Sequence, residues 1–346
     1  YKFNTFIAMF LIISEIYLFL FRTHVKLGNR HKLSVGTEYI VDVLKSQTDN
    51  IAKEDAYTLA LFAQDEIKLL RNLQALIGVR YIYHENFKNH ATPNVALMYK
   101  PGKFNFRASY AAGFRTPTLS ELYATDIAKK NDRLTIGNLD LKPEKNNYFS
   151  LSAEYVHERF SVSVNAFYNN IRDMIDYNTI ATGDKAMEQY GHKEVRQRDN
   201  IAEAKVHGIN VSANAYLGAG FNLSGGYTHL NTQDVELEQP IDKSIKNAYN
   251  INAQWAHSWK IYRLNINLNG RINSKRFSKS YGYAPEYQLW DLNTRHSFNL
   301  KSVIIEPGFG MENLFDYMDD RPYNSNYATL TPGRSFYISL SLKFKS

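Results

Sequence analysis

The stretch Tyr110-Ala-Ala-Gly-Phe-Arg-Thr-Pro117 opens a long polar segment that closes on Gly137-Asn-Leu-Asp-Leu-Lys-Pro-Glu144. On both sides of this segment apolar residues occupy every second position, in Phe104-Asn-Phe-Arg-Ala-Ser-Tyr110 and in Phe149-Ser-Leu-Ser-Ala-Glu-Tyr155. That period is typical of a β-strand with one apolar and one polar face. Each of the two motifs contains a proline, which lacks an amide hydrogen and is expected to end the ladder beside it. The sequence therefore predicts two strands joined by roughly thirty residues, far more than the usual connection of about 4 to 6, so the segment is functional or disordered.

The same alternation covers nearly the whole chain. It is clearest at residues 160–166, 209–215 and 264–269, where apolar residues alternate with Ser and Asn. Helical periodicity is hard to find anywhere. Fifteen strands are predicted, at residues 21–27, 32–44, 55–69, 72–85, 92–100, 103–113, 145–157, 160–176, 200–217, 220–230, 247–257, 260–273, 287–299, 302–314 and 334–345.

The connections between these strands alternate between short and long. Short turns fall at residues 28–31, 70–71, 101–102, 158–159, 218–219, 258–259 and 300–301. Long connections fall between them, at residues 45–54, 86–91, 114–144, 177–199, 231–246, 274–286 and 315–333. This rule is typical of an outer-membrane barrel, which has short periplasmic turns and long external loops. Aromatic residues near strand ends fit the interfacial girdles of such a barrel, although Tyr is also common in ordinary strands.

The composition is compatible with a membrane barrel. Mean hydropathy is only −0.42 beside 44% hydrophobic residues. A helical membrane protein needs apolar runs of about 20 residues, whereas a barrel distributes its apolar face by alternation and scores as soluble. The absence of Cys excludes a disulfide framework and thiolate metal sites. The net charge of +7 comes from basic residues spread along the chain rather than clustered, so no nucleic-acid partner is expected.

The N-terminal end is expected to be irregular. Residues 6–13 and 16–21 form the only unbroken apolar block, so residues 1–20 are either a signal-like segment or a truncated barrel strand, and the barrel portion is expected to span residues 21–346. Asn, Ser, Arg, Lys and Gln on the alternate strand faces predict a wet lumen. An odd number of about fifteen strands does not close in the usual bacterial way, so the chain is expected to be incomplete at its N-terminus.

Six motifs in a fixed order carry a resemblance to a known family. With them the chain resembles the C-terminal part of the β-barrel of TonB-dependent outer-membrane receptors, over roughly residues 23 to 346. The motifs are Gly113-Phe-Arg-Thr-Pro117 with Glu121-Leu-Tyr123, Asn138-Leu-Asp-Leu-Lys-Pro-Glu144, Tyr168-Asn-Asn-Ile-Arg-Asp-Met-Ile175, Asn200-Ile-Ala-Glu-Ala204 with Gly208, Asn313-Leu-Phe-Asp316, and Pro332-Gly-Arg-Ser-Phe336.

This resemblance implies an all-β fold, a transmembrane antiparallel barrel of about 22 strands, in the outer membrane of a Gram-negative bacterium. It implies uptake of a scarce ligand, a ferric siderophore, haem or cobalamin, with energy supplied through TonB. The implied partners are TonB, through an N-terminal region outside this sequence, outer-membrane lipid and lipopolysaccharide, the barrel-assembly machinery and a surface lipoprotein. The family's plug and TonB-contact segment are expected to be absent from this chain.

Residues 114–144 correspond to the seventh external loop of the resembled barrel. In haem receptors of the family this loop carries a Phe-Arg-Ala-Pro box and an Asn-Pro-Asp/Asn-Leu box, with a haem-ligating His between them. In this chain Thr116 replaces the Ala, Leu139 replaces the Pro, and no His lies between Pro117 and Asn138. Haem is therefore one candidate among three.

The candidate ligand-binding residues begin with Arg115, which follows a strand and could hold a ligand carboxylate bidentately. The alternative is a structural ion pair with Glu121 or Asp140. Asn138 and Asp140 could contact a ligand, but they can equally satisfy backbone amides in a turn. Tyr123, beside Glu121, could stack on a planar ligand.

Other candidates lie on the remaining long connections. His90 and His192, with Met187 and Tyr190, are candidate contacts for iron or haem, although isolated loop histidines usually bind no metal. Further stacking candidates are Tyr177, Tyr281 and Tyr283. No catalytic residue, resident metal site or cofactor is predicted.

Three alternatives to a receptor remain open. The sequence has no Gly-x-Ser-x-Gly, His-Glu-x-x-His or Walker motif, so an enzyme is not expected, although enzymes on outer-membrane barrels exist. The second alternative is a plugless passive porin or a non-functional truncated receptor, and a large steady current across a planar bilayer would indicate an open pore. A soluble β-sheet binding protein would partition into buffer without detergent.

Overall fold

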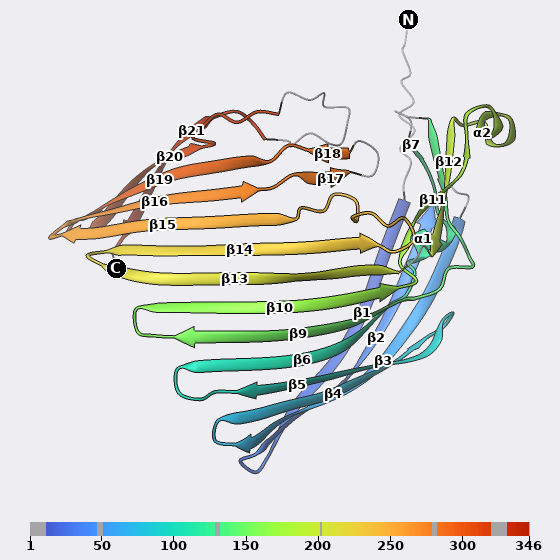
Figure 1. The fold of residues 1–346 in the computed structure, drawn as a ribbon, viewed down its shortest axis with the longest axis horizontal. Coiled ribbons are helices and arrows are strands. Elements are labelled where there is room, and N and C mark those ends of the chain that lie inside the picture. The colour runs from blue at the N-terminus through green and yellow to red at the C-terminus, as the bar shows by residue number, and fades with distance from the viewer. Residues whose placement is uncertain are drawn as a thin grey trace, which may run out of the picture. The chain divides into compact units, whose positions relative to one another are not determined.

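A computed structural model describes residues 12–46, 51–128, 132–200, 203–278, 282–319 and 331–345. In this part of the chain, fifteen strands pair in chain order in one antiparallel sheet, here called the wall (Figure 1). They are β1 (Ile12–Leu27), β2 (His31–Ser46), β3 (Ile51–Leu70), β4 (Leu73–His84), β5 (Lys88–Tyr99), β6 (Phe104–Arg115), β9 (Glu144–Val156), β10 (Phe160–Arg172), β13 (Ala204–Gly218), β14 (Phe221–Asp234), β15 (Asn247–Trp259), β16 (Tyr262–Asn273), β19 (Tyr287–Asn299), β20 (Val303–Glu312) and β21 (Ser335–Phe344).

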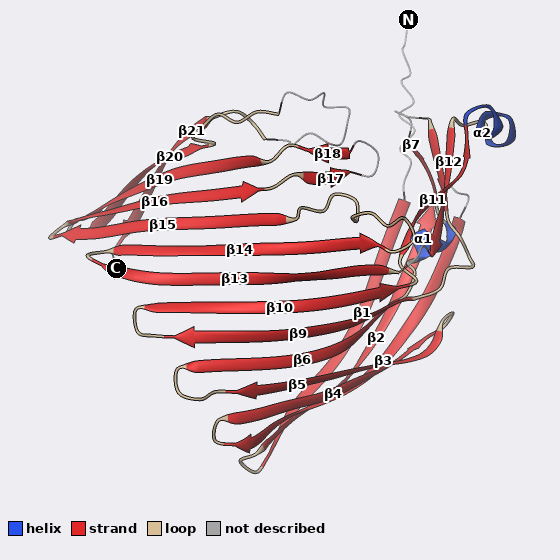
Figure 2. Cartoon of the chain, in the orientation of Figure 1, coloured by secondary structure: helices blue, strands red, loops and turns tan. Residues whose placement is uncertain are grey.

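The long connections carry the remaining elements. A second sheet has the order β11-β12-β8-β7, and a hairpin joins β17 to β18. Figure 2 shows how little of the chain is helical. The bounds are α1 (Leu119–Tyr123), β7 (Thr125–Ala128), β8 (Arg133–Ile136), β11 (Ile175–Thr182), α2 (Gly183–Tyr190), β12 (Glu194–Asn200), β17 (Arg276–Ser278) and β18 (Gly282–Ala284). Among the described residues, neither of these helices has the length and apolar character to cross a membrane.

The strand predictions hold for all fifteen wall strands, with corrections at their ends. The strand predicted at 160–176 ends at Arg172, because Asp173 adopts the left-handed conformation (φ 56°) and breaks the ladder. The strand predicted at 200–217 begins at Ala204, since Asn200 belongs to β12 of the smaller sheet. Residues 1–11 of the predicted N-terminal segment lie outside the described residues, while residues 12–20 belong to β1.

The chain divides into two compact units. The first comprises Tyr1–Leu97, Ser109–Phe149 and Asn169–Ala204. In it, Tyr39 of β2 pairs with Leu59 of β3, and Leu59 pairs with Tyr83 of β4, so apolar residues share one strand face. The opposite face carries Arg80, whose guanidinium lies 5.9 Å from the ring centroid of Phe62.

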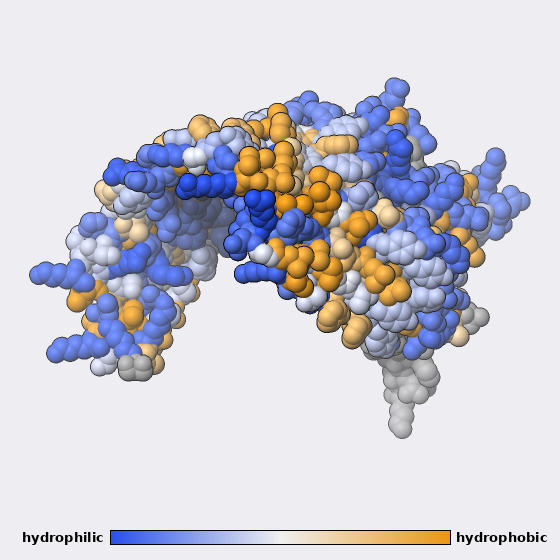
Figure 3. Space-filling view, turned by 90° about the horizontal axis from the view of Figure 1, so that it is seen from below, coloured by the Kyte–Doolittle hydropathy of each residue, from blue (hydrophilic) through white to orange (hydrophobic). Residues whose placement is uncertain are grey.

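The second unit comprises Met98–Ala108, Ser150–Tyr168 and Lys205–Ser346. On one face of its strands, Asn252 donates hydrogen bonds to Asn267 (2.7 Å) and Asn269 (2.6 Å). On the other face Leu223 and Ile251 are exposed. Figure 3 shows hydrophobic residues gathered in patches on the surface that it presents, beside hydrophilic ones. Because apolar side chains point outward into the surroundings of the wall, most of the hydrophobic residues do not form a packed interior.

Candidate functional site

Two long connections, residues 116–143 and 173–203, fold together into a structure here called the cap, which lies wholly in the first unit. It contains α1, α2 and the four strands of the smaller sheet. Strand β12 pairs with β11 in antiparallel fashion and with β8 in parallel fashion, so the sheet joins the two connections. The segment predicted to be functional or disordered is therefore ordered in the part that the structure describes.

Arg115, the last residue of β6, ties the cap to the wall. Its Nε and Nη2 donate to the two carboxylate oxygens of Glu144 at 2.7 and 2.6 Å, and its Nη1 donates to Oε2 of Glu121 at 2.9 Å. Glu144 Oε1 also accepts from the backbone amide of Ile175 at 2.8 Å. The Arg115 side chain is 42% exposed, whereas the side chains of Glu121 and Glu144 are only 15 and 17% exposed. These residues, Arg115, Glu121 and Glu144, are called the Arg115 hub below.

The short helix α1 is held at its N-terminus by a capping box. Glu121 donates its backbone amide to Oγ1 of Thr118 at 3.2 Å, and the Thr118 amide donates to Oε2 of Glu121 at 2.9 Å. This reciprocal pair satisfies two amides that a helix start leaves free. Partial burial alone raises the pKa of Glu121, but the hydrogen bonds from Arg115 and Thr118 and the Arg115 charge outweigh it, so the pKa lies below its usual range.

Two small apolar clusters fix α1 against its surroundings. Leu119 packs with Leu44 of β2 and Ala56 of β3, and Leu122 packs with Leu141 and Ile175. Tyr123 contacts both clusters. Since buried apolar contacts on both sides of a five-residue helix are its main stabilisation, tertiary packing rather than helix propensity keeps α1 folded.

Two asparagines join distant segments of the cap. Asn138 accepts from the amide of Asp140 at 2.9 Å and donates through Nδ2 to the carbonyl of Arg198 at 2.9 Å. Asn200 accepts from the Lys142 amide at 2.6 Å and donates to the carbonyls of Lys142 and Asp173, at 2.8 and 2.6 Å. Asn138 satisfies a backbone amide in a local turn, as expected from the sequence. Its bond to the carbonyl of Arg198 was not expected.

The backbone at Gly137 is too crowded to accept a side chain. A Cβ at this position would lie 2.5 Å from the carbonyl oxygen of Leu122, because the end of β8 passes directly over α1. The Asn138 amide donates to the carbonyl of Glu121 at 3.0 Å in the same place. The close backbone approach explains why a glycine precedes Asn138 in the motif.

The candidate metal contacts have other partners. His192 Nδ1 lies 2.9 Å from Oδ1 of Asp132, and this hydrogen bond lowers the pKa of Asp132. The ring of His90, on β5, stacks on Phe114 at 3.8 Å, with Nε2 2.9 Å from the carbonyl of Phe87. No group of three His, Asp or Glu side chains among the described residues is arranged to hold a metal ion.

One face of the smaller sheet carries an arginine row. The Arg198 guanidinium lies 3.9 Å from the centroid of the Tyr177 ring, its cross-strand partner. Because side chains alternate between faces, Arg196 shares this face, and Arg133 joins it as the partner of Glu194. Glu194 accepts from Nε of Arg196 at 2.5 Å. Nε of Arg133 is buried and has no hydrogen-bond partner in the described structure.

The structure gathers most of the candidate ligand residues in the cap or at its base. Arg115 and Glu121 meet in the hub, Tyr123 ends α1, Asn138 lies against α1, and Asp140 is exposed beside it. Tyr190 ends α2, on which Met187 is 43% exposed, and His192 follows. His90 lies on β5, outside the cap, Tyr283 belongs to the second unit, and Tyr281 lies outside the described residues.

Three residues of this region were not among the candidates predicted from the sequence. Glu144, rather than Asp140, is the second partner of Arg115, and Asn200 and Arg198 join the two connections. Glu144 and Asn200 both stand in the motifs that carried the family resemblance, so their place in those motifs was the available signal. Arg198 has no such signal, because its contact with Tyr177 depends on strand pairing across the cap.

Residues 11–314 match the family described as TonB dependent receptor-like, beta-barrel. The chain belongs to this family. Its fold is that of the receptor β-barrel, which is an outer-membrane fold of Gram-negative bacteria, and the predictions of family, fold class and location are confirmed.

Solved structures agree with this TonB-dependent receptor fold. The ferric enterobactin receptor PfeA of Pseudomonas aeruginosa is 19% identical, with a TM-score of 0.79 over 96% of this chain and 54% of PfeA. The siderophore receptor PirA of the same organism is 18% identical, with a TM-score of 0.77 over 98% of this chain and 58% of PirA. The copper transporter OprC is 11% identical, with a TM-score of 0.77 over 96% of this chain and 59% of OprC. The chain thus spans a little over half the length of these relatives, which are receptors and transporters rather than enzymes.

Proposed function

We propose that this TonB-dependent receptor barrel takes up a ferric siderophore, and that its cap forms part of the ligand site. The arginine row carries the proposal. Three guanidinium groups, of Arg133, Arg196 and Arg198, share one sheet face with the Tyr177 ring. Ferric siderophores combine anionic oxygen groups with extended organic surface, and guanidinium and aromatic side chains bind these two features by charge-assisted hydrogen bonds and stacking.

The electrostatics of the arginine row support an anionic ligand. Glu194 and Asp126 lie on the same face by strand register, so the row keeps an excess of positive charge. Arg133 Nε is buried without a hydrogen-bond partner in the described structure, and a buried unpaired donor costs free energy until an acceptor reaches it. A siderophore carboxylate, catecholate or hydroxamate oxygen is an acceptor of the required kind.

Two relatives agree with this ligand class, since one is described as a ferric enterobactin receptor and one as a siderophore receptor. Haem and cobalamin are the second choices, and copper is favoured only by the likeness to OprC. We propose in addition that TonB drives the uptake, through a plug and contact segment of the complete receptor.

Deletion of residues 118–137 tests the role of the cap. The deletion removes α1, β7 and β8, and with them the hub partner Glu121. We expect loss of binding of a ferric catecholate siderophore, measured by quenching of tryptophan fluorescence, while the barrel still resists heating in detergent. Unchanged binding by the shortened protein would reject the cap as the ligand site.

A finer test separates the arginine row from the rest of the cap. Arg198→Ala and Tyr177→Ala are expected to weaken siderophore binding by about tenfold each, because a stacked or charge-assisted contact contributes roughly 1–2 kcal/mol. Tyr216→Ala is the matched control, since Tyr216 is a comparably exposed tyrosine near the short turn that follows β13. A ferric hydroxamate, haemin, cyanocobalamin and Cu²⁺ should be titrated in parallel, and tighter binding of any of these would reassign the ligand.

TonB dependence is tested in cells with the complete receptor. Accumulation of ⁵⁵Fe from the siderophore is expected only when TonB is present and the inner membrane is energised. Equal uptake without TonB would support the passive-porin alternative.

A further inference from the structure

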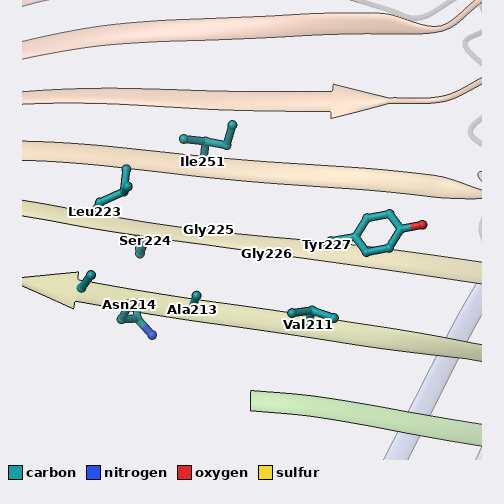
Figure 4. A pocket seen from close by; sticks show the side chains of 10 residues that line it. Val211, Ala213, Asn214, Leu223, Ser224, Gly225, Gly226, Tyr227 and Ile251 are labelled. Atoms are coloured by element: carbon teal, nitrogen blue, oxygen red, sulfur yellow. The ribbon is translucent and has the colours of Figure 1, made fainter. Parts of the chain in front are cut away.

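We propose that the outer face of β13, β14 and β15 holds one acyl chain of a periplasmic-leaflet phospholipid in a built groove. The groove has a volume of about 410 Å³ and lies within the second unit. Figure 4 shows its lining along the three strands. The inference goes beyond ligand uptake and rests on the outer-membrane location of the family, so it stands or falls independently of the siderophore proposal.

The groove lies on the face of the wall that meets the bilayer. Leu223 and Ile251, which line it, are 43 and 36% exposed. On the opposite face of the same strands, Thr228 donates to Asn210 at 2.9 Å, and Asn252 bonds to its neighbours on β16. Strands of a membrane barrel have apolar side chains on the lipid-facing side and polar side chains, here those of Asn and Thr, on the inner side. The groove therefore faces the acyl chains of the bilayer.

Small residues create the hollow. Gly225 pairs with Ile251 across the strands and therefore lies on the outward face, where it has no side chain. Ala213 supplies only a methyl group on the neighbouring strand. The larger side chains of Val211, Leu223 and Tyr227 stand around these two positions, which leaves a concave apolar surface between them.

Aromatic pairs mark both ends of the groove. Toward the short turns, Phe221 pairs with Trp255 at 5.9 Å between ring centroids. Toward the long loops, Tyr227 stacks on Tyr249 at 4.7 Å, and the Tyr227 hydroxyl donates to Asn247 at 3.0 Å. The Phe221–Trp255 pair lies at the short-turn end, the level typical of an interfacial aromatic girdle. The Tyr227–Tyr249 pair closes the groove at its other end.

The groove is long enough for one acyl chain of a lipid in one leaflet. Leu223 and Tyr227 are four residues apart, about 13 Å along a strand. This is roughly half of the apolar band of an outer-membrane barrel, which is about 25 Å tall. The groove begins next to the Phe221–Trp255 pair, at the short-turn end, which is the periplasmic side of the family's barrels. A second copy of the barrel would need an interface above about 1,000 Å², whereas the groove extends only about 13 Å along the strands.

The test uses the native receptor in outer-membrane vesicles enriched in phosphatidylethanolamine that carries a photoreactive diazirine in the middle of one acyl chain. Labelled residues are identified by mass spectrometry of peptides. We expect labelling of Leu223, Tyr227 and Ile251 to exceed that of Val162 and Val164 on β10, which are comparably exposed apolar residues outside this groove. Equal labelling of both regions would overturn the proposal.

Filling the groove provides the matched comparison. Ala213→Leu is expected to lower labelling of the groove about fourfold or more, the effect of displacing at least one buried methylene group. Ala166→Leu adds the same atoms to an exposed position of β10 and should leave groove labelling unchanged. Gly225→Val fills the groove from β14 and should lower labelling in the same way. It serves as an independent test if Ala213→Leu does not fold.

Two further results would reject an acyl chain as the occupant. Groove labelling that Ala213→Leu does not change would show that the hollow does not select the chain. A groove protected from the lipid probe, with disulfide-linked dimers forming in an Ile251→Cys variant, would assign this surface to a second copy of the barrel.

Discussion

The wall and the cap differ in how far apart along the chain their interacting residues lie. In the wall, each described strand pairs with the next wall strand, as β15 does with β16 across a two-residue turn. In the cap, Asn138 bonds to Arg198 and Asp132 bonds to His192, each pair sixty positions apart. The wall therefore repeats one local rule, while the cap depends on a few specific long-range contacts. We expect single substitutions to damage the cap far more than the wall.

The largest difference is expected between Leu122→Ala in the cap and Leu151→Ala in the wall. Leu122 is 5% exposed in an apolar cluster, and its truncation should destabilise the cap by about 2–4 kcal/mol. Leu151 is 63% exposed on the outward, lipid-facing side, so its truncation leaves no cavity inside the protein and should not change exchange of the cap. Hydrogen exchange of residues 118–142 measures the first effect. Equal exchange in the two variants would remove the distinction between wall and cap.

Loss of the Arg115 guanidinium is expected to have the next largest effect. Arg115→Ala leaves two poorly exposed carboxylates facing each other, which should destabilise the cap by about 1–3 kcal/mol after allowance for solvent screening of the half-exposed guanidinium. Arg115→Lys keeps the charge but not the bidentate fork, so about half of that loss is expected.

A wall ion pair serves as the control for this comparison. Lys32 and Glu66 lie 3.2 Å apart and are both about half exposed. Lys32→Ala should change stability by no more than about 1 kcal/mol. Hydrogen exchange at Ile175, whose amide is bonded to Glu144, reports the Arg115 variants directly. If the Ile175 amide remains protected from exchange in Arg115→Ala, the Arg115 hub does not tie the cap to the wall.

Removal of the helix cap should have a smaller effect. Thr118→Ala deletes the hydroxyl that accepts from the Glu121 amide, at an expected cost of about 0.5–2 kcal/mol to α1. Thr118→Ser keeps the hydroxyl and should restore most of the protection. If Ser and Ala at this position exchange equally fast, the capping box does not stabilise α1.

Acid should destabilise the cap at a higher pH than the wall. This is the smallest of the expected effects. The pKa of Glu121 in the folded protein lies below its ordinary value of 4.5. A carboxylate with a lowered pKa stabilises the fold fully above its unfolded-state pKa, and this stabilisation is lost as pH falls through the folded-state value. Exchange protection of α1 is therefore expected to be constant above about pH 5.5 and to decline below about pH 4.5. An Arg115→Ala variant should show a weaker decline over the same interval.

The sequence predicted the wall well because each strand carries its own signal. The alternation at residues 160–166 identifies β10 without knowledge of its neighbours, and the departure at its end follows from one residue, Asp173, in a conformation that the pattern does not encode. The cap was predicted only as a long connection. Helix α1 is shorter than any window that reveals helical periodicity, and the pairing of β8 with β12, which joins the two halves of the smaller sheet, links residues about sixty positions apart.

The candidate site shows the same division. Arg115 and Glu121 were recognised because both stand in one motif, close in sequence. Their relation to Glu144 required the fold, since Glu144 approaches only when β9 returns beside β6. The candidate iron contact His192 pairs with Asp132, a partner that nothing in the local sequence around either residue indicates.

The Oε2 atom of Glu121 accepts hydrogen bonds from two different structures, the Arg115 side chain and the first turn of α1. A substitution at Arg115 is therefore expected to change the effect of one at Thr118, because both side chains donate to this oxygen. We expect these positions to have been inherited as a set among relatives, so that a variant acceptable in one lineage fails when transplanted alone into another.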